Sequence, residues 1–501
     1  MAAGAHVGLT MKRVTYHLEE PATGQADVWR LSAAQLHRQY LEGMLTPRAV
    51  ADACLARLDA VNPQLNAVIA RRDEAFLRDA DASAERYARG QPLSPLDGVP
   101  VSIKDNLQTG DLPTTWGSPA LRQHVADNDE LPVARLRAAG ALIIGKTNLP
   151  EFALEGYTDN SLFGATVNPW DLALTPGGSS GGAVASVAAG VTPIALGTDG
   201  GGSIRRPASH CGLVGFKPSI GSIARDGGLP SLLLDFEVAG PLARSVIDAR
   251  TLFNVLRGPH PNDRRSYAAE SAKTPVPEAC ESRATSLRIL YVPTLDNAPV
   301  DFRIATRCHD AMATLRELGH DVQQGELPLD LSFMTQAWPV IGQVGLARLF
   351  QRHPQWREAC STKYLDMAEQ GSRHEASLLW QIIEDVEALR RDCVDLFSEY
   401  DILITPATAA LPWPAGEAFP PIIAGQPVGP RGHAVFTAWV NAAGLPALAV
   451  PVAPSPEGLP MGIQMISRYG ADDLLLDLGE AYEAASPWAH RWPSIGTTSA
   501  Q

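Results

Sequence analysis

The chain has 501 residues, of which 45% are apolar and 19% charged, a balance typical of a folded globular protein and not of a disordered chain. Its 41 Lys and Arg are outnumbered by 55 Asp and Glu, and the net charge of −14 argues against nucleic acid or an anionic membrane as a partner. A small-molecule substrate is expected instead. The sequence also lacks a signal peptide and an apolar run of membrane length, so a cytoplasmic protein is expected.

The predicted elements alternate between helix and strand. Ser32 with Gln35 predicts a capping box at the start of one helix, and Thr46-Pro47 predicts the start of a second. The next predicted elements are a helix near 74–89, a strand at 101–103, a helix near 132–139 and a strand at 141–144. After a Pro-rich surface excursion at 258–284 come a strand at 287–292, helices at 303–318 and 374–399, a strand at 401–405, and two strands and a helix over 446–486. This alternation is typical of an α/β fold.

Two matches to short motifs fail on their context. Residues 140–147 spell the P-loop letters GALIIGKT, but the four middle residues predict a buried strand and not a phosphate-binding loop. Residues 178–182 fit G-x-S-x-G around Ser180, but a nucleophile elbow needs a preceding strand, and Thr175-Pro176-Gly177 stands there instead. A Ser-His-Asp hydrolase is therefore disfavoured, although it stays open.

The segment TDGGGS, residues 198–203, is the strongest local feature. Consecutive glycines before Ser203 let backbone N–H groups converge, which is the geometry of an oxyanion hole. Glycine runs are often only flexible loops, but the glycine run at 200–202 follows a predicted strand at 192–196, which favours a fixed turn. The serine needs a base. His210 is the nearest histidine and lacks a recognisable triad setting, whereas Lys104 ends a predicted strand and would have a lowered pKa if it points inward.

Five segments together resemble the amidase signature family. They are GVPVSIKDN around Lys104, GKTNLPEFA, NSLFGATVNPWDLALTPGGSSGG, ALGTDGGGSIRRPASHCGLVGFKPS and GLPALAVPVAPSPEGLPMGIQMISR. The resemblance runs from about residue 30 to 493. It implies an α/β fold with one large mixed, twisted sheet sandwiched between layers of helices, and no metal or organic cofactor.

The resemblance also implies a domain organisation. Residues 1–30 are expected to form an N-terminal arm and 494–501 a C-terminal tail. Between them, 31–493 would be a single amidase signature domain, with the signature core at about 95–220 and a variable substrate-pocket region at about 330–440.

Each family role maps onto a residue of this chain. The resemblance implies Ser203 as nucleophile, Ser179 on a cis peptide as the bridging serine, and Lys104 as base. The remaining roles are an oxyanion hole from the amides of Gly200, Gly201, Gly202 and Ser203, and support of the site by Ser180, Asp199 and Arg205. The glycine at 200 departs from the family, where a Thr or an aliphatic residue is more usual, so either a looser oxyanion loop or a wider acyl pocket is expected.

The substrate is less well specified. The pocket is expected near Glu155–Tyr157 and in the variable region, whose tryptophans are either pocket walls or ordinary core: Trp338, Trp356, Trp413 and Trp439. The predicted function is hydrolysis of a small aryl or alkyl amide, with carbamates, esters and a homodimer left open. The alternatives are the glutamine-hydrolysing subunit of a tRNA-dependent amidotransferase, whose expected tyrosine-rich segment is not evident, and a catalytically silent amide-binding member.

Overall fold

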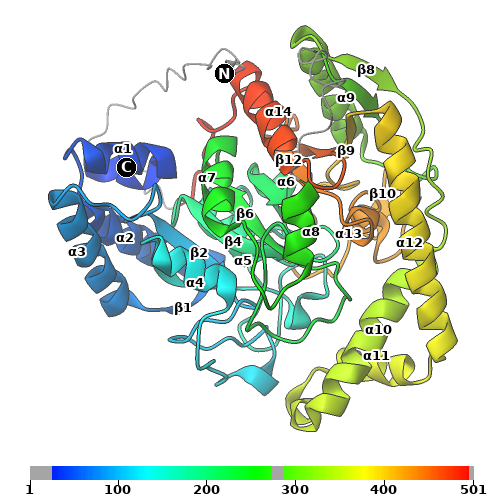
Figure 1. Ribbon diagram of the computed structural model, residues 1–501, viewed down its shortest axis with the longest axis horizontal. Coiled ribbons are helices and arrows are strands. Elements are labelled where there is room, and N and C mark those ends of the chain that lie inside the picture. The colour runs from blue at the N-terminus through cyan, green and yellow to red at the C-terminus, as the bar shows by residue number, and fades with distance from the viewer. Residues whose placement is uncertain (1–24, 273–285, 496–501) are drawn as a thin grey trace, which may run out of the picture.

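One large sheet runs through the molecule. The structure is a computed structural model that describes residues 25–272 and 286–495. Within these residues, 11 strands lie in the order β1-β3-β2-β4-β6-β5-β12-β13-β9-β7-β8 (Figure 1). Their bounds are β1 Val68–Arg71, β2 Pro100–Lys104, β3 Leu142–Thr147, β4 Ile194–Asp199, β5 Val214–Lys217, β6 Val238–Ala243, β7 Arg288–Tyr291, β8 Asp321–Gln324, β9 Ile402–Pro406, β12 Ala447–Pro451 and β13 Gly462–Ile466. A separate hairpin joins β10, Ile422–Ile423, to β11, Gln426–Pro427.

The sheet is mixed, as the family resemblance implies. Strand β2 lies parallel between β3 and β4, and β7 lies parallel between β8 and β9. The strands that connect these two groups, from β4 through β6, β5, β12 and β13 to β9, pair antiparallel. Because β2 and β4 run parallel, their carboxyl ends meet at the same edge of the sheet. Those ends carry Lys104 and Asp199.

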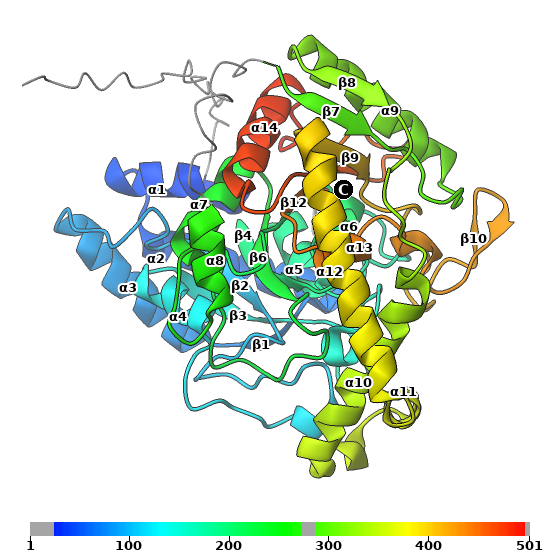
Figure 2. The ribbon, with the colours of Figure 1, turned by 45° about the vertical axis from the view of Figure 1, so that its right-hand side comes forward.

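Helices cover both faces of the sheet. Their bounds are α1 Ala33–Leu41, α2 Pro47–Leu65, α3 Asp73–Ala88, α4 Leu131–Ala138, α5 Gly181–Ala188, α6 Arg205–Cys211, α7 Val246–Leu256, α8 Arg265–Ala272, α9 Phe302–Glu317, α10 Met334–Arg352, α11 Thr362–Ser372, α12 Ala376–Glu399, α13 Ala438–Ala442 and α14 Asp472–Ala485. Helices α4, α7, α9 and α14 share one apolar core with the strands, and α5 and α6 share another. Helices α10 to α12 stand together beside the sheet (Figures 1 and 2).

Alternation along β3 shows why both faces are buried. Ile143 packs into the core that contains α7, whereas Leu142 and Ile144 pack into the core that contains α2. A strand whose side chains alternate between two apolar layers is expected to be a near-continuous hydrophobic run, which is what Ala-Leu-Ile-Ile is. The α/β fold with a sandwiched mixed sheet is therefore confirmed.

Local signals located the predicted helix starts correctly. The amide of Gln35 donates to Ser32 Oγ at 3.1 Å and the amide of Ser32 donates to Gln35 Oε1 at 2.9 Å, so the capping box is formed. Thr46 caps α2 through the amide of Ala49, with Pro47 as the first helical residue. Each such cap satisfies N–H groups that the first helical turn leaves without an acceptor.

The elements that were not predicted include strands β1, β5, β6 and β8 and helices α6, α7, α10, α11 and α13. Strand β6 reads VAGPLA, and its glycine and proline are residues that normally argue against a central strand. The glycine has a packing reason, since a Cβ on Gly240 would lie 2.3 Å from the carbonyl oxygen of Phe216 on β5. The close approach of the β5 and β6 backbones therefore requires glycine at position 240.

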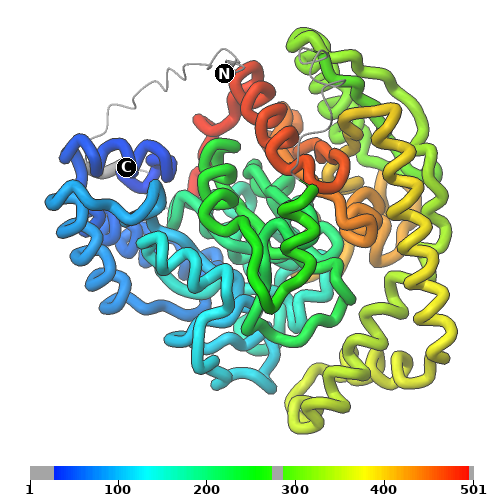
Figure 3. The backbone as a smooth tube through the Cα atoms, in the orientation of Figure 1, coloured from blue at the N-terminus to red at the C-terminus, as the bar shows by residue number. Residues whose placement is uncertain are grey.

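The structure describes only parts of the predicted N-terminal arm and C-terminal tail. Residues 1–24 and 496–501 lie outside the described residues, as does the 273–284 part of the predicted excursion, whose earlier part contains α8. The rest of the predicted arm forms a 3-10 helix, Gln25–Arg30, at the blue end of the backbone in Figure 3. Val28 of this helix belongs to the same apolar cluster as residues of α2 and Ile495 of the predicted tail. In the described part of the chain, no helix is long and apolar enough to cross a membrane.

Candidate active site

Lys104 points inward from the end of β2 and is fully buried. Its Nζ donates to Ser179 Oγ at 2.7 Å, to the carbonyl oxygen of Thr198 at 3.2 Å and to Thr198 Oγ1 at 3.0 Å. The alternative that a lysine at a strand end reaches solvent is thereby excluded. The base and the bridging serine of the predicted relay are in hydrogen-bond contact.

Burial changes the acid–base chemistry of this lysine. Loss of hydration lowers the pKa of Lys104 from its ordinary value of 10.5 to about 7, because the charged form is the one that water stabilises. The carboxylates of Glu237 and Asp199 raise the pKa, and Arg225 lowers it. A large fraction of Lys104 is therefore neutral near pH 7 and able to accept a proton.

The serine loop before α5 is fixed on both sides of Ser179. The Gly178–Ser179 peptide is cis. Ser180 Oγ donates to the carbonyl oxygen of Thr198 at 3.1 Å, and the amide of Ser180 donates to the carbonyl oxygen of Ser203 at 3.2 Å. The serine loop and the glycine loop that ends at Ser203 thus lie side by side. Ser203 itself is 7% exposed.

The two rejected motifs and the histidine alternative can be checked against the same geometry. The letters of the P-loop fall on strand β3, as predicted. The Ser180 hydroxyl contacts a carbonyl oxygen and not an imidazole. His210 Nε2 contacts the carbonyl oxygen of Ala410 at 3.1 Å, and burial lowers the pKa of His210 to about 4. Among the described residues, no group of three or more His, Cys, Asp and Glu is placed to hold a metal.

Asp199 organises the glycine loop. Its carboxylate accepts hydrogen bonds from the amides of Gly202 at 2.6 Å and Ile204 at 3.0 Å, and from Arg205 Nε at 3.0 Å. These partners outweigh the effect of burial and hold the pKa of the Asp199 carboxyl well below its usual range. The amide of Gly202 is therefore engaged by Asp199, which leaves the amides of Gly200, Gly201 and Ser203 as the remaining candidates for the oxyanion hole.

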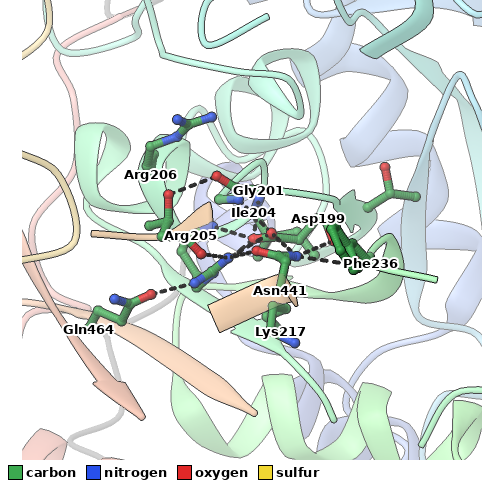
Figure 4. A network of polar contacts seen from close by, with 12 residues as sticks. Asp199, Gly201, Ile204, Arg205, Arg206, Lys217, Phe236, Asn441 and Gln464 are labelled. Atoms are coloured by element: carbon green, nitrogen blue, oxygen red, sulfur yellow. Dashed lines mark hydrogen bonds and ion pairs between the residues drawn. The ribbon is translucent and has the colours of Figure 1, made fainter. Parts of the chain in front are cut away.

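Arg205 extends this network across the molecule. Its guanidinium also contacts Gln464 on β13 and Asn441 on α13. Asn441 Nδ2 in turn donates to the Asp199 carbonyl oxygen at 2.8 Å and to that of Phe236 at 3.1 Å, so these groups satisfy one another at the centre of Figure 4. Side chains from two distant segments, α13 and β13, therefore hold Asp199 and Arg205 in place.

Two large side chains fill the space beside the loop glycines. A Cβ on Gly200 would lie 2.7 Å from Leu233 Cδ1, and one on Gly201 would lie 2.4 Å from the ring of Trp338. Leu233 thus occupies the space where the family's usual side chain at position 200 would begin. Trp338 stacks on Phe236, with ring centroids 6.2 Å apart.

The other tryptophans do not reach the loop in this way. Trp439 and Trp413 are buried, at 2% and 4% exposure, and Trp356 stacks on His353. The Glu155–Tyr157 segment does approach the serine loop, because a Cβ on Gly178 would lie 2.2 Å from the carbonyl oxygen of Tyr157.

Several residues of this site were not predicted. Thr198 is the first residue of the TDGGGS segment but was given no role. It receives hydrogen bonds from Lys104, Asn106 and Ser180, so its place at the strand end was a usable signal. Thr437, which donates from Oγ1 to the Gly201 carbonyl oxygen at 2.7 Å, and Asn441 lie far away in sequence and gave no local signal.

Known proteins resemble the chain over nearly its whole length. The Amidase family profile matches residues 49–476. The acylamidase of Rhodococcus erythropolis is 34% identical over 481 residues, which cover 93% of this chain and 97% of the relative. The glutamyl-tRNA(Gln) amidotransferase of Chloroflexus aggregans has one subunit that is 33% identical, with 93% and 98% covered. The solved structure of 6-aminohexanoate cyclic dimer hydrolase complexed with substrate superimposes with a TM-score of 0.82 at 29% identity, over 94% of this chain and 99% of that one.

Proposed function

The chain belongs to the amidase signature family and is an amide-hydrolysing enzyme, and we propose that it acts alone on small amides through an acyl-enzyme on Ser203. The observation that carries this proposal is the 2.7 Å contact between buried Lys104 and Ser179 Oγ. A lysine with a pKa of about 7 is a competent base at neutral pH, because it is sufficiently deprotonated to accept a proton and sufficiently basic to take one.

The proposed relay moves one proton in each half-reaction. Neutral Lys104 takes the Ser179 hydroxyl proton while Ser179 takes that of Ser203, whose oxygen attacks the amide carbonyl carbon. When the tetrahedral intermediate collapses, the C–N bond breaks and the relay returns the proton to the departing nitrogen. Water then attacks the acyl-enzyme by the same route and releases the acid.

The negative oxygen of the intermediate needs donors that are in place before the reaction. We assign this role to the amides of Gly200, Gly201 and Ser203, since the amide of Gly202 binds Asp199. Asp199 and Arg205 then act as positioning residues, because they fix the loop without touching the reacting atoms.

The direct test measures ammonia or amine release from a panel of aryl and alkyl amides. We expect turnover by the purified chain, loss of turnover in Ser203→Ala, and no loss in Ser398→Ala, a serine on α12 whose hydroxyl contacts only the Asp395 carbonyl oxygen. Mass spectrometry of an activated ester under single-turnover conditions should detect an acyl adduct in the wild type and not in Ser203→Ala. Unchanged turnover in Ser203→Ala would contradict the assignment of the nucleophile.

The rival function is that of an amidotransferase subunit, which the relative from Chloroflexus aggregans raises. Small-amide turnover by the isolated chain supports the stand-alone enzyme. The rival would be favoured if glutamine were the one amide of the panel that is turned over, and if this turnover required added glutamyl-tRNA and partner subunits. A folded protein that binds amides but forms no acyl adduct with any substrate would be the silent member of the family.

A further inference from the structure

Two neighbouring arginines at the start of α6 have very different surroundings. Arg205 is paired with Asp199 at 2.9 Å and with side chains from two other segments. Arg206 is 6% exposed, yet among the described residues its Nε has no hydrogen-bond partner and its Nη2 reaches only the Gly178 carbonyl oxygen, at 3.5 Å. In Figure 4 the Arg206 guanidinium lies apart from the network around Asp199. A buried cation without a counter-ion is costly, so a function is expected for it.

Arg206 lies next to the reacting groups. Its Nε is 3.0 Å from the position that a Cβ on Gly202 would take, and its Nη2 faces the carbonyl group of the Gly178–Ser179 peptide. The guanidinium is therefore adjacent both to the residue before Ser203 and to the residue before Ser179. A ligand atom bound to Arg206 would belong to a molecule at the serine relay.

A second arginine flanks the same loop from the variable region. The Arg431 guanidinium lies over the ring of Trp338, 4.8 Å from its centroid, and that ring covers Gly201. In the described part of the chain, neither Arg206 nor Arg431 forms an ion pair with a carboxylate. The nearby Glu155 carboxylate is engaged by Lys363 and by the Tyr364 hydroxyl.

A buried histidine completes the cluster. In the part of the chain that the structure describes, neither ring nitrogen of His433 has a hydrogen-bond partner, although the residue is only 3% exposed. Its Nε2 lies 2.4 Å from where a Cβ on Gly156 would be. Burial lowers the pKa of His433 well below its ordinary value, and the charges of Arg206, His210 and Arg431 lower it further. A neutral imidazole can donate one hydrogen bond to an anion.

We propose that Arg206, Arg431 and His433 form a subsite for a carboxylate carried by the amide substrate. This inference rests on the proposed amide hydrolysis and names its substrate class. A guanidinium matches a carboxylate with two parallel N–H donors, and a ligand carboxylate would supply the counter-ion that Arg206 lacks among residues 25–272 and 286–495. The carboxylate sits on either the acyl or the amine part of the substrate, and the two positions are separated by experiment.

The test compares matched pairs of amides. Monoamides of short dicarboxylic acids are set against fatty amides of equal length, and N-acyl amino acids against N-acyl alkylamines. We expect one acid-bearing class to exceed its neutral partner by about 30-fold in kcat/KM, the scale of a charge-assisted contact. In Arg206→Gln the preference should fall to about threefold or less, mainly through KM. Arg206→Lys should retain part of it, and Arg348→Gln, an exposed arginine on α10, should retain all of it.

A binding measurement separates this inference from the proposed function. Calorimetry measures the binding of two ligands, the monoamide of glutaric acid and N-acetylglycine, to Ser203→Ala and to the Ser203→Ala/Arg206→Gln double variant. At least one of the two ligands should bind Ser203→Ala about tenfold more tightly than it binds the double variant. This result is expected even if no substrate of the panel is turned over. If Arg206→Gln does not fold, Arg431→Gln serves instead. Absence of an acid preference and of acid binding in the parent proteins would overturn the subsite. So would equal kcat losses on acid and neutral amides in Arg206→Gln, since they mean that Arg206 only positions the serine loop.

Discussion

The signature core, residues 95–220, and the variable region, residues 330–440, both reach the glycine loop, but with different chemistry. The core supplies fully buried polar groups, such as Lys104 and Arg205, each satisfied by hydrogen bonds. The variable region supplies the ring of Trp338 beside Gly201 and one hydrogen bond, from the Thr437 hydroxyl to the Gly201 carbonyl oxygen. Removing one member of a buried polar network leaves its partners unsatisfied, whereas trimming a packed ring mainly changes the shape of a surface. Chemistry is thus expected to depend on the first region and selectivity on the second.

The largest effect should come from Lys104→Ala in the core. We expect a loss of about 10⁴-fold in amide kcat/KM, at the upper end of general-base effects, and a smaller loss on the matched ester. An amine needs the relayed proton to depart, and an alkoxide needs it less. Initial rates on the paired substrates measure the two losses, and equal losses would contradict the relay.

Asp199→Asn should be the next most damaging change. It leaves Arg205 buried without its counter-ion, for which we expect about 3–5 kcal/mol of lost unfolding free energy. Asp235→Asn, which breaks the half-exposed pair with Arg390, should cost about 1 kcal/mol or less. Denaturant unfolding of both variants gives the comparison, and similar costs would show that the buried network is no more demanding than a surface pair.

The pH dependence of kcat/KM tests the core with a smaller expected effect than the two substitutions above. Because only neutral Lys104 accepts a proton, kcat/KM should fall about tenfold per pH unit below about pH 7 and level off above it. The Glu237 carboxylate raises the pKa of Lys104, so Glu237→Gln should move this limb to lower pH. Glu74→Gln, at an exposed position on α3 far from the site, should leave the limb unmoved. A shift to higher pH in Glu237→Gln would contradict the assignment of the limb to Lys104.

The smallest effect is expected from Trp338→Ala in the variable region. Loss of the ring beside Gly201 should raise KM for bulky amides by about tenfold and change kcat by about twofold or less, since about 1–2 kcal/mol of contact is removed away from the reacting atoms. Trp380→Ala, at a 64% exposed position on α12, is the matched control. A kcat loss as large as that of the core variants would erase the distinction between the two regions.

Local patterns predicted those parts of the fold that local physics determines. The Ser32 capping box, the proline start of α2 and the apolar run of β3 all depend on neighbours within a few residues. Strand β6 was not predicted because its Gly240 is required by the close approach of the Phe216 backbone on β5. The local sequence around Gly240 does not contain this contact.

The site divides in the same way. The glycine loop was predicted from its own residues, and Lys104 joined it only through the family resemblance. Nothing near Asn441 indicates that it holds Asp199. Arg206 was not singled out because its sequence neighbour Arg205 belongs to the expected support of the site. The two differ only in three dimensions, where Arg205 forms an ion pair with Asp199 and Arg206 forms none with any described carboxylate.

The position of Lys104 also depends on how β2 is aligned with its neighbours. Ser102 faces α5 through Ser186, at 3.0 Å, and Lys104 follows two residues later on the same side, whereas Ile103 packs into the opposite apolar layer. Pairing of Ile103 with Leu196 fixes this alignment. A slip of one residue would present an isoleucine to Ser179 and drive the lysine into hydrocarbon. Under the proposed relay, strand register is therefore a catalytic property, and a mutation that loosens β2 is expected to abolish activity without changing any reacting group.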